Sequence, residues 1–342
     1  MNDLNTQLMQ ATPQAVELAG QLLREGQVVA IPTETVYGLA ASSLNGEAVK
    51  KIFSAKGRPQ DNPLISHISD LSMMEMVVQD VPTAAYKLAE TFWPGPLTMI
   101  LRRSSKVTDE VCAGLETASV RMPSHPVAQA VIRAAGVPLA APSANLSGSP
   151  SPTTARDVLA DMDGKIPLIL DGGDCQVGVE STVISLAGDE PVLLRPGYIT
   201  LEQLEQALGR EVKLADAVLH QLKKGERAAS PGMKYKHYAP KAEVTILNGS
   251  FEAYCSYVEQ HCEPGTFCLC FSGEEKSLSC PCVLYGHERA PAEQAQRLFS
   301  ALRELDARGA KRVYARCPGQ EGVALAVYNR LLRAAAFRVI SL

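Results

Sequence analysis

Short apolar runs alternate with amphipathic segments along most of this chain. Residues 28–31 form an apolar run rich in β-branched side chains, which is typical of a buried strand. Upstream, Thr12 and Pro13 are residue types that begin a helix, apolar positions follow at helical spacing, and Gly26 is suited to end it. The alternation continues to about residue 208. We therefore predict an α/β fold with a mixed sheet, because several strands adjoin without a helix between them.

Further elements are expected by the same criteria. The pattern predicts helices over 46–54, 82–92, 127–135 and 153–162, and strands over 63–68, 97–101, 138–141, 166–170, 182–186 and 192–194.

The pattern restarts after residue 241. Strands are expected over 244–247, 266–271, 312–315 and 337–340, and helices over 251–261, 291–308 and 323–335. About four strands alternating with helices favour a smaller Rossmann-like α/β domain with an open sheet of parallel type. The sequence has no GxGxxG fingerprint, so dinucleotide binding is not supported. We divide the chain into a first domain, 11–208, a linker, 209–241, and a C-terminal domain, 242–342.

The linker has an unusual composition between residues 221 and 241. It carries six Lys or Arg residues against one acid, and Gly, Pro and Ser interrupt any periodicity. It also contains Tyr235, His237 and Tyr238, which a flexible tether does not need. We hypothesise that this segment closes over a cavity of the first domain as a lid. A solvated basic tether is the alternative.

Composition limits the classes of function. A chain of 342 residues favours two domains, and a net charge of −4 argues against a broad nucleic-acid footprint. The first ten residues are polar, unlike a signal peptide, and no apolar run approaches the length of a membrane span. Nine cysteines, an odd number, favour a reducing cytoplasm.

The first candidate site follows the strand at 28–31. Pro32 ends that strand, and the hydroxyls of Thr33, Thr35 and Tyr37 come directly after it, at a strand end where ligands bind in α/β sheets. Lys56 and Arg58 flank a glycine in a loop whose backbone can approach an anion closely, and Asn62 and His67 follow. Such a unit suits a phosphate. Solvated loop charges and a surface turn are the alternative for each piece taken alone.

Similar polar clusters recur later in the chain. Arg121 lies at a strand end, and the small-residue stretch 140–148 contains Ser143, Asn145 and Ser147. Ser181 and a further loop cation, Arg195, follow. Turns rich in Ser and Asn are common without any ligand, so this interpretation stays open for each cluster.

The candidate residues are cations and hydroxyls rather than nucleophiles. The sequence has no evident Ser-His-Asp or Cys-His pairing, P-loop or HExxH motif. Phosphoryl or nucleotidyl transfer suits such a site, because it depends on positioning and charge stabilisation. Zinc is a weaker alternative for the pairs Cys268/Cys270 and Cys280/Cys282, since CxC is not the usual zinc spacing and the first pair shares one face of an expected strand.

The motifs PTETVYGL, AKGRP, NPL with His67, VRMP, PSANLSG, VESTV and RPG resemble the YrdC-like domain in order and spacing. The match covers about residues 11–208, and SPGMKYKHYAP with the segment after it resembles the two-domain members, the threonylcarbamoyl-AMP synthases. The resemblance implies a twisted sheet with a large positive cavity. It also implies synthesis of threonylcarbamoyl-adenylate and pyrophosphate from L-threonine, bicarbonate and ATP with Mg²⁺.

The resemblance also assigns residues and partners. The threonine site is expected to use Thr35, His67, Arg121, Ala141 and Ser181. The ATP site is expected to use Lys56, Arg58, Asn62, Thr117, Ser143, Asn145, Ser151, Arg195 and Tyr235, with Lys56 and Arg58 acting in catalysis. The metal ligands are not assigned. The product is expected to pass to a tRNA-modifying threonylcarbamoyl transferase complex, and direct contact with tRNA or other RNA is a further expectation.

Two other functions compete. An RNA-binding protein is one, because related single-domain proteins have a basic concave surface. A carbamoyl-transfer module of hydrogenase maturation is the other, but such proteins carry zinc-finger and acylphosphatase-like regions for which this chain has no room.

Overall fold

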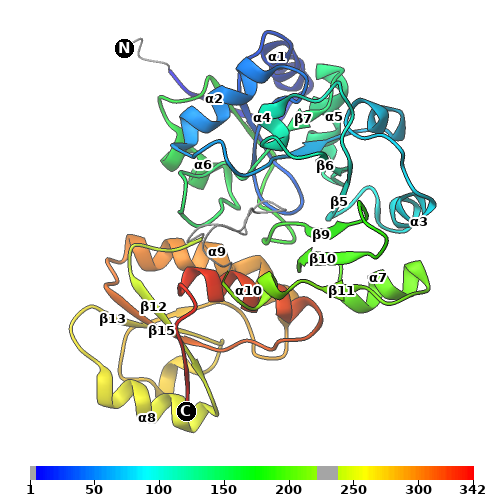
Figure 1. The fold of residues 1–342 in the computed structure, drawn as a ribbon. Coiled ribbons are helices and arrows are strands. Elements are labelled where there is room, and N and C mark those ends of the chain that lie inside the picture. The colour runs from blue at the N-terminus through cyan, green and yellow to red at the C-terminus, as the bar shows by residue number, and fades with distance from the viewer. Residues whose placement is uncertain (1–4, 222–237) are drawn as a thin grey trace.

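The structure, a computed structural model, describes residues 5–221 and 238–342. Within these ranges the strands form one sheet of 11 strands and one of 5 strands. The two sheets lie at opposite ends of the molecule, and helices α9 (Pro291–Ala307) and α10 (Gly322–Ala334) lie between them (Figure 1). Tyr235 lies outside the described residues, and so does most of the segment 221–241 to which the lid hypothesis applies.

The larger sheet is mixed, as predicted. Parallel and antiparallel neighbours alternate irregularly along it, for example parallel β2 with β8 but antiparallel β2 with β3. In spatial order its strands are β1 (Gln7–Gln10), β8 (Leu168–Asp171), β2 (Val29–Ile31), β3 (Gly38–Ser42), β7 (Leu139–Ala140), β4 (Ile65–His67), β6 (Thr117–Arg121), β5 (Leu97–Arg102), β9 (Thr182–Ser185), β10 (Val192–Arg195) and β11 (Lys213–Leu214).

The smaller sheet is parallel throughout its described strands, which confirms the expected type and adds one strand, β14, to the expected number. In spatial order its strands are β14 (Cys282–Leu284), β13 (Thr266–Cys270), β15 (Arg312–Arg316), β12 (Glu243–Asn248) and β16 (Val339–Ser341).

The remaining helices flank the sheets. They are α1 (Pro13–Arg24), α2 (Gly46–Lys56), α3 (Thr83–Phe92), α4 (Asp109–Cys112), α5 (Pro126–Ala135), α6 (Ala155–Met162), α7 (Leu201–Leu208) and α8 (Phe251–His261), with short 3₁₀ turns at Leu71–Met76, Asp216–Val218 and Glu275–Ser277.

Strand β2 of the larger sheet is buried on both faces, as the apolar run at 28–31 predicted. Val29 and Ile31 point into an apolar cluster that includes residues of α1 and α5, whereas Ala30 points into a second cluster on the opposite face. Alternating side chains of one strand thus serve two layers of core.

Local signals explain how α2 presents its cations. The Asn45 side chain accepts a hydrogen bond from the Ala48 N–H at 3.1 Å and begins the helix. Gly57 ends it with φ of 60°, a left-handed conformation that glycine adopts without strain. Lys56 and Arg58 therefore lie on either side of a helix end, with different surroundings.

Two loop residues of the first domain extend the apolar core of the C-terminal domain. Val36 and Val179 of the first domain belong to the same buried cluster as Tyr238 and the apolar faces of α9 and α10. At Gly178 a Cβ atom would lie 2.4 Å from the backbone of Gln296 in α9. Glycine is therefore needed where the loop before Ser181 meets the C-terminal domain.

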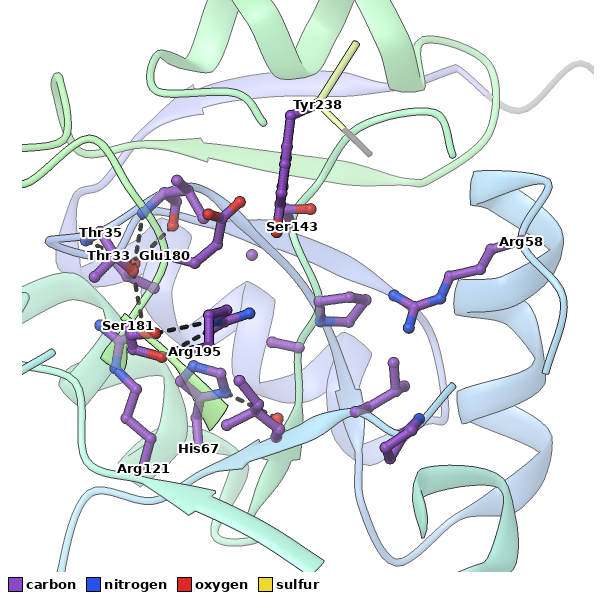
Figure 2. Close-up of a pocket in the computed structure, with 17 residues that line it drawn as sticks. Thr33, Thr35, Arg58, His67, Arg121, Ser143, Glu180, Ser181, Arg195 and Tyr238 are labelled. Carbon is purple, nitrogen blue, oxygen red and sulfur yellow. Dashed lines mark hydrogen bonds between the residues drawn. The ribbon is translucent and has the colours of Figure 1, made fainter. Parts of the chain in front are cut away.

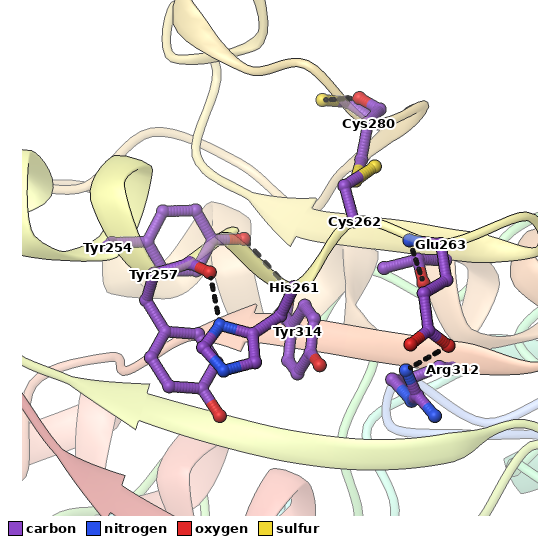
Figure 3. Close-up of a disulfide and its surroundings, with 10 residues drawn as sticks. Tyr254, Tyr257, His261, Cys262, Glu263, Cys280, Arg312 and Tyr314 are labelled. Atoms are coloured by element: carbon purple, nitrogen blue, oxygen red, sulfur yellow. Dashed lines mark hydrogen bonds and ion pairs between the residues drawn. A yellow bond between two sulfur atoms is a disulfide. The ribbon is translucent and has the colours of Figure 1, made fainter. Parts of the chain in front are cut away.

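The cysteines depart in part from the expectation of a reducing environment. Cys262, just after α8, and Cys280 form a disulfide (Figure 3), because the chain before β14 returns to within 6.2 Å of Cys262, Cα to Cα. Cys268 and Cys270 are free and buried in β13, as small apolar residues. Within the described ranges no helix is both long and apolar enough to cross a membrane.

Candidate active site

A cavity opens between the strand ends of the larger sheet and Tyr238, near the end of the linker. It encloses about 610 Å³, its open mouth included, and is lined by Thr33, Thr35, Val36, Gly38, Arg58, Pro63, Leu64, Ile65, His67, Arg121, Ala141, Pro142, Ser143, Glu180, Ser181, Arg195 and Tyr238. Figure 2 shows Arg58 on one side of this cavity and Thr35, Ser181 and Arg195 on the other. The structure thus brings together most of the residues that the sequence singled out.

A second, smaller recess continues from the Arg58 side. It shares Arg58, Ser143 and Tyr238 with the cavity and adds Lys56 and Asn145 to its wall. The cavity and the recess are therefore neighbours, separated by shared wall residues.

One end of the site is organised by a buried arginine. Arg121, the last residue of β6, forms an ion pair of 2.7 Å with Glu34, and both side chains are under a tenth exposed. Its Nη1 donates to Thr35 Oγ1 at 2.9 Å. Because Thr33 Oγ1 donates to the Val36 carbonyl, the Thr35 hydroxyl is left to donate to Thr33 Oγ1, 2.8 Å away. This network makes the strand-end turn rigid.

The charges at this end compensate each other. Burial favours a higher pKa for Glu34, but the positive charge of Arg121 and its hydrogen bond prevail, so the pKa is lowered and the carboxylate stays ionised. Burial and the nearby charge of Arg121 lower the pKa of His67 to about 3. His67 is therefore neutral at physiological pH, and its Nδ1–H donates to the Ile65 carbonyl at 3.1 Å.

Lys56 is buried at the opposite end. Its ammonium donates to the Ser143 carbonyl, to the Asn145 carbonyl at 2.7 Å and to Asn145 Oδ1 at 3.3 Å. These acceptors are neutral, and burial together with the charge of Arg58 lowers the pKa of Lys56 well below its usual value. Through these hydrogen bonds Lys56 fixes the loop 143–145.

Arg58 is less buried than Lys56 and reaches the cavity. Its Nη2 donates to the Asn62 carbonyl at 3.1 Å, and its guanidinium carbon lies 5.9 Å from the centre of the Phe53 ring. The Asn62 side chain is buried, although it lines neither the cavity nor the recess.

Ser181 and Arg195 form the wall on the side of Thr35, opposite Arg58 (Figure 2). Arg195 donates through Nε to the Ser181 carbonyl at 3.0 Å and through Nη2 to Ser181 Oγ at 3.1 Å. Ser181 Oγ also lies 2.7 Å from Thr98 Oγ1. Burial lowers the pKa of Arg195 to about 10, so it remains charged at neutral pH. A residue expected at the threonine and one expected at ATP thus touch each other.

Like Asn62, two further residues expected at ATP, Ser151 and Thr117, lie outside the walls of the cavity and the recess. Ser151 is fully buried and donates to Glu180 Oε1 at 2.5 Å, so it acts on the wall through that carboxylate. Thr117 begins β6, four residues before Arg121, and pairs with Arg102 of β5. At about 3.3 Å per strand residue, this places it some 13 Å along the strand from Arg121.

The sequence interpretation missed two carboxylates in the cavity network. Glu34 was visible beside Thr33 and Thr35, but its partner Arg121 is far away in the chain. Glu180 lies within the VEST motif, yet its burial depends on Arg330 of α10, 150 residues away. Acidic residues in a phosphate site become plausible only when such partners are known.

A resident metal centre does not fit these residues. Within 5–221 and 238–342, no group of three or more His, Cys, Asp or Glu side chains is placed to hold a metal ion. Glu34 is paired with Arg121, and Glu180 is engaged by Ser151 and Arg330.

Comparison with known proteins agrees with this geometry. A family model described as telomere recombination matches residues 21–197, and one for the threonylcarbamoyl-AMP synthase C-terminal domain matches residues 199–336. A threonylcarbamoyl-AMP synthase of Bacillus subtilis is 47% identical over 99% of this chain and 97% of its own length. The chain belongs to the threonylcarbamoyl-AMP synthase family. The member from Pyrococcus abyssi is 44% identical, over 95% of each chain.

Solved structures give the same result for the fold. The structure of P. abyssi Sua5 complexed with L-threonine is 40% identical to this chain, covers 99% of both chains and superposes with a TM-score of 0.91. Escherichia coli YciO, at 26% identity and a TM-score of 0.50, covers 58% of this chain and 96% of its own. The motif-based resemblance is thus confirmed, and this member of the threonylcarbamoyl-AMP synthase family is an enzyme of that kind.

Proposed function

We propose that the cavity and recess form the active site, with L-threonine bound at the end organised by Arg121 and ATP bound at the end organised by Lys56 and Arg58. The observation that carries this proposal is that the two spaces are neighbours and share Arg58, Ser143 and Tyr238 as wall residues. A reaction between two substrates needs both to be held in contact. The solved P. abyssi structure with L-threonine supports the assignment of one end to an amino acid.

The chemistry suits such a site. The threonine nitrogen takes up carbon dioxide, derived from bicarbonate, to give a carbamate. A carbamate oxygen then attacks the α-phosphorus of ATP, a new P–O bond forms, and the bond to the leaving pyrophosphate breaks. Because the carbamate is short-lived in water, a cavity that holds it against the nucleotide raises the chance of attack before it decomposes.

At the threonine end, we propose that Arg121 receives the carboxylate. Its contacts with Glu34, Thr35 and the Gly95 carbonyl leave guanidinium N–H groups for a ligand. Neutral His67 and Ser181 offer hydrogen-bonding groups to the hydroxyl and amine without adding charge. Ala141 leaves space beside them.

At the ATP end, we propose that Lys56 and Arg58 offset negative charge on the phosphates during transfer. Ser143, Asn145, Asn62, Ser151 and Arg195 support this end, and Thr117 has no comparable support from its position. Mg²⁺ enters in this proposal as part of the substrate Mg·ATP, held by phosphates and water, which is how this ion is commonly bound.

We further propose that residues 11–208 form the catalytic domain and that the enzyme works in the cytoplasm. The product would be consumed by a tRNA-modifying threonylcarbamoyl transferase complex. A direct contact with tRNA has less support, because the net charge of −4 provides no broad cationic surface.

The test is pyrophosphate release by the full chain from Mg·ATP. We expect release that needs both L-threonine and bicarbonate, because the attacking group exists only when both are present. Omission of each in turn is the control. Equal release without bicarbonate, or with L-serine as with L-threonine, would contradict the assignment.

A further inference from the structure

A fully buried arginine of the C-terminal domain reaches the wall of the catalytic cavity. Arg330 lies in α10 and has no exposed surface. Its Nε donates to Glu180 Oε2 at 2.8 Å, and its Nη2 donates to the Glu180 carbonyl at 3.2 Å. Its Nη1 donates to the Pro196 carbonyl at 2.9 Å. One guanidinium therefore holds two separate loops of the first domain.

These two loops carry wall residues of the site. Glu180 precedes Ser181 in the chain, and Pro196 follows Arg195, so Arg330 fixes the backbone next to both. Ser181 and Arg195 in turn hydrogen-bond each other. The planar guanidinium, with its fixed donor directions, sets the spacing of the loops in a way that a single point charge would not.

The same contact extends to the expected ATP residues. While Oε2 of Glu180 accepts from Arg330, Oε1 accepts from Ser151 at 2.5 Å. Arg330 thus orients the carboxylate that orients Ser151. Its guanidinium carbon also lies 5.9 Å from the centre of the Tyr238 ring, which lines both the cavity and the recess.

Attachment of the domains alone does not require this arrangement. Arg303 of α9 pairs with Asp161 of α6 at 2.8 Å, and the apolar contacts of Val36 and Val179 with the C-terminal domain contribute further adhesion. Arg333, one turn beyond Arg330 on α10, is also buried and donates to the Ala217 carbonyl at 2.8 Å, outside the cavity wall. Arg330, by contrast, contacts Glu180, which lines the cavity, and Pro196, which follows the wall residue Arg195.

We propose that Arg330 is a positioning residue for the synthase reaction, through which the C-terminal domain sets the spacing between the Ser181 loop at the threonine and the Arg195 loop at the nucleotide. The proposal rests on the proposed function of the cavity. It gives the C-terminal domain a part in substrate binding without placing any of its side chains on the reacting atoms.

The test compares Arg330→Lys and Arg330→Met with a matched control, Arg333→Met, in the full chain. Steady-state pyrophosphate release is measured with varied Mg·ATP at saturating L-threonine and bicarbonate, and circular dichroism reports folding. We expect kcat/KM for ATP to fall about 10- to 100-fold in both Arg330 variants, mainly through a higher KM, since misplaced wall residues weaken binding. We expect less than about a threefold change in Arg333→Met, below ~0.7 kcal/mol.

The split between KM and kcat separates positioning from stability. A variant that is only partly folded has fewer active molecules, which lowers apparent kcat and leaves KM unchanged. If Arg330→Met does not fold, Arg330→Lys decides, because it keeps a cation beside Glu180 but loses the forked contacts. Normal KM for ATP in folded Arg330→Lys would overturn the proposal. The wild-type requirement for threonine and bicarbonate is measured separately, so a failure of the proposed function is recognised independently.

Discussion

The two ends of the cavity hold their cations in different ways. Arg121 is paired with the buried carboxylate of Glu34, so the charges at the threonine end compensate each other. Lys56 donates to two carbonyls and one side-chain amide oxygen, all of them neutral. Threonine brings one carboxylate, whereas ATP brings several phosphate charges, and the end that keeps its positive potential suits the more highly charged substrate.

The two ends should also respond differently to substitution, one mainly by a loss of fold stability and the other mainly by a loss of activity. A buried ion pair that loses one partner leaves an uncompensated charge, which destabilises the fold strongly. Burial of a cation among neutral acceptors costs desolvation free energy, which the hydrogen bonds offset only in part. Removal of such a cation therefore destabilises the fold less than removal of one partner of an ion pair. We therefore expect stability to depend mainly on Arg121 and phosphate chemistry to depend mainly on Lys56 and Arg58.

The largest expected effect is on stability, in Arg121→Met. Glu34 would remain buried without its partner, and we expect the free energy of unfolding to fall by about 3–5 kcal/mol. Urea denaturation followed by circular dichroism measures this. The double variant Glu34→Gln/Arg121→Met is the control and should recover part of the loss. A loss below about 1 kcal/mol in Arg121→Met would show that the ion pair does not organise this end.

The next effect is on catalysis, in Lys56→Met. We expect kcat/KM for ATP to fall roughly 30- to 900-fold, because a preorganised cation is lost. This corresponds to a loss of about 2–4 kcal/mol of transition-state stabilisation. The affinity for L-threonine, measured by calorimetry, should stay unchanged. Lys51→Met is the matched control, since Lys51 is an exposed lysine of the same helix that donates to the Gly26 carbonyl. A similar loss in threonine affinity would erase the distinction between the two ends.

We expect the same role for Arg58. Arg58→Ala should also reduce kcat/KM for ATP, through a loss of about 2–4 kcal/mol of transition-state stabilisation. Arg102→Ala is a suitable control, because Arg102 pairs with Asp80 on the surface. If the activity of Arg58→Ala stayed within about threefold of the wild type, a loss below ~0.7 kcal/mol, Lys56 would stabilise the phosphate charge without help from Arg58.

The smallest effect concerns protons. The pKa of Lys56 is well below its usual value in the free protein, and phosphate charge beside it should raise that pKa, so ATP binding should take up protons. As pH rises through the lowered pKa, the cation is lost and ATP affinity should fall by at most about tenfold per pH unit. Calorimetry in buffers of different ionisation enthalpy measures the uptake, which should disappear in Lys56→Met. Proton release on binding would contradict this account.

Several elements could be predicted from the sequence because their signals are local. Thr12 and Pro13 begin α1, and the apolar run at 28–31 contains β2. Other elements lacked such signals. β3 consists of Gly38–Ser42, whose small side chains carry no strand pattern, although it is fully buried in the sheet. β1 is polar and largely exposed, and only its pairing with β8 makes it a strand.

The candidate site divides in the same way. The sequence by itself determined which residue types were present and where they clustered along the chain, because hydroxyls at strand ends, a glycine between two cations and Ser/Asn turns are local patterns. The tertiary structure alone decided how these residues differ. Lys56 and Arg58 are alike in sequence, but one is buried among carbonyls and the other borders the cavity. Glu34 with Arg121, and Glu180 with Arg330, become ion pairs only when distant segments meet, since burial and Coulomb attraction depend on distance in space rather than along the chain.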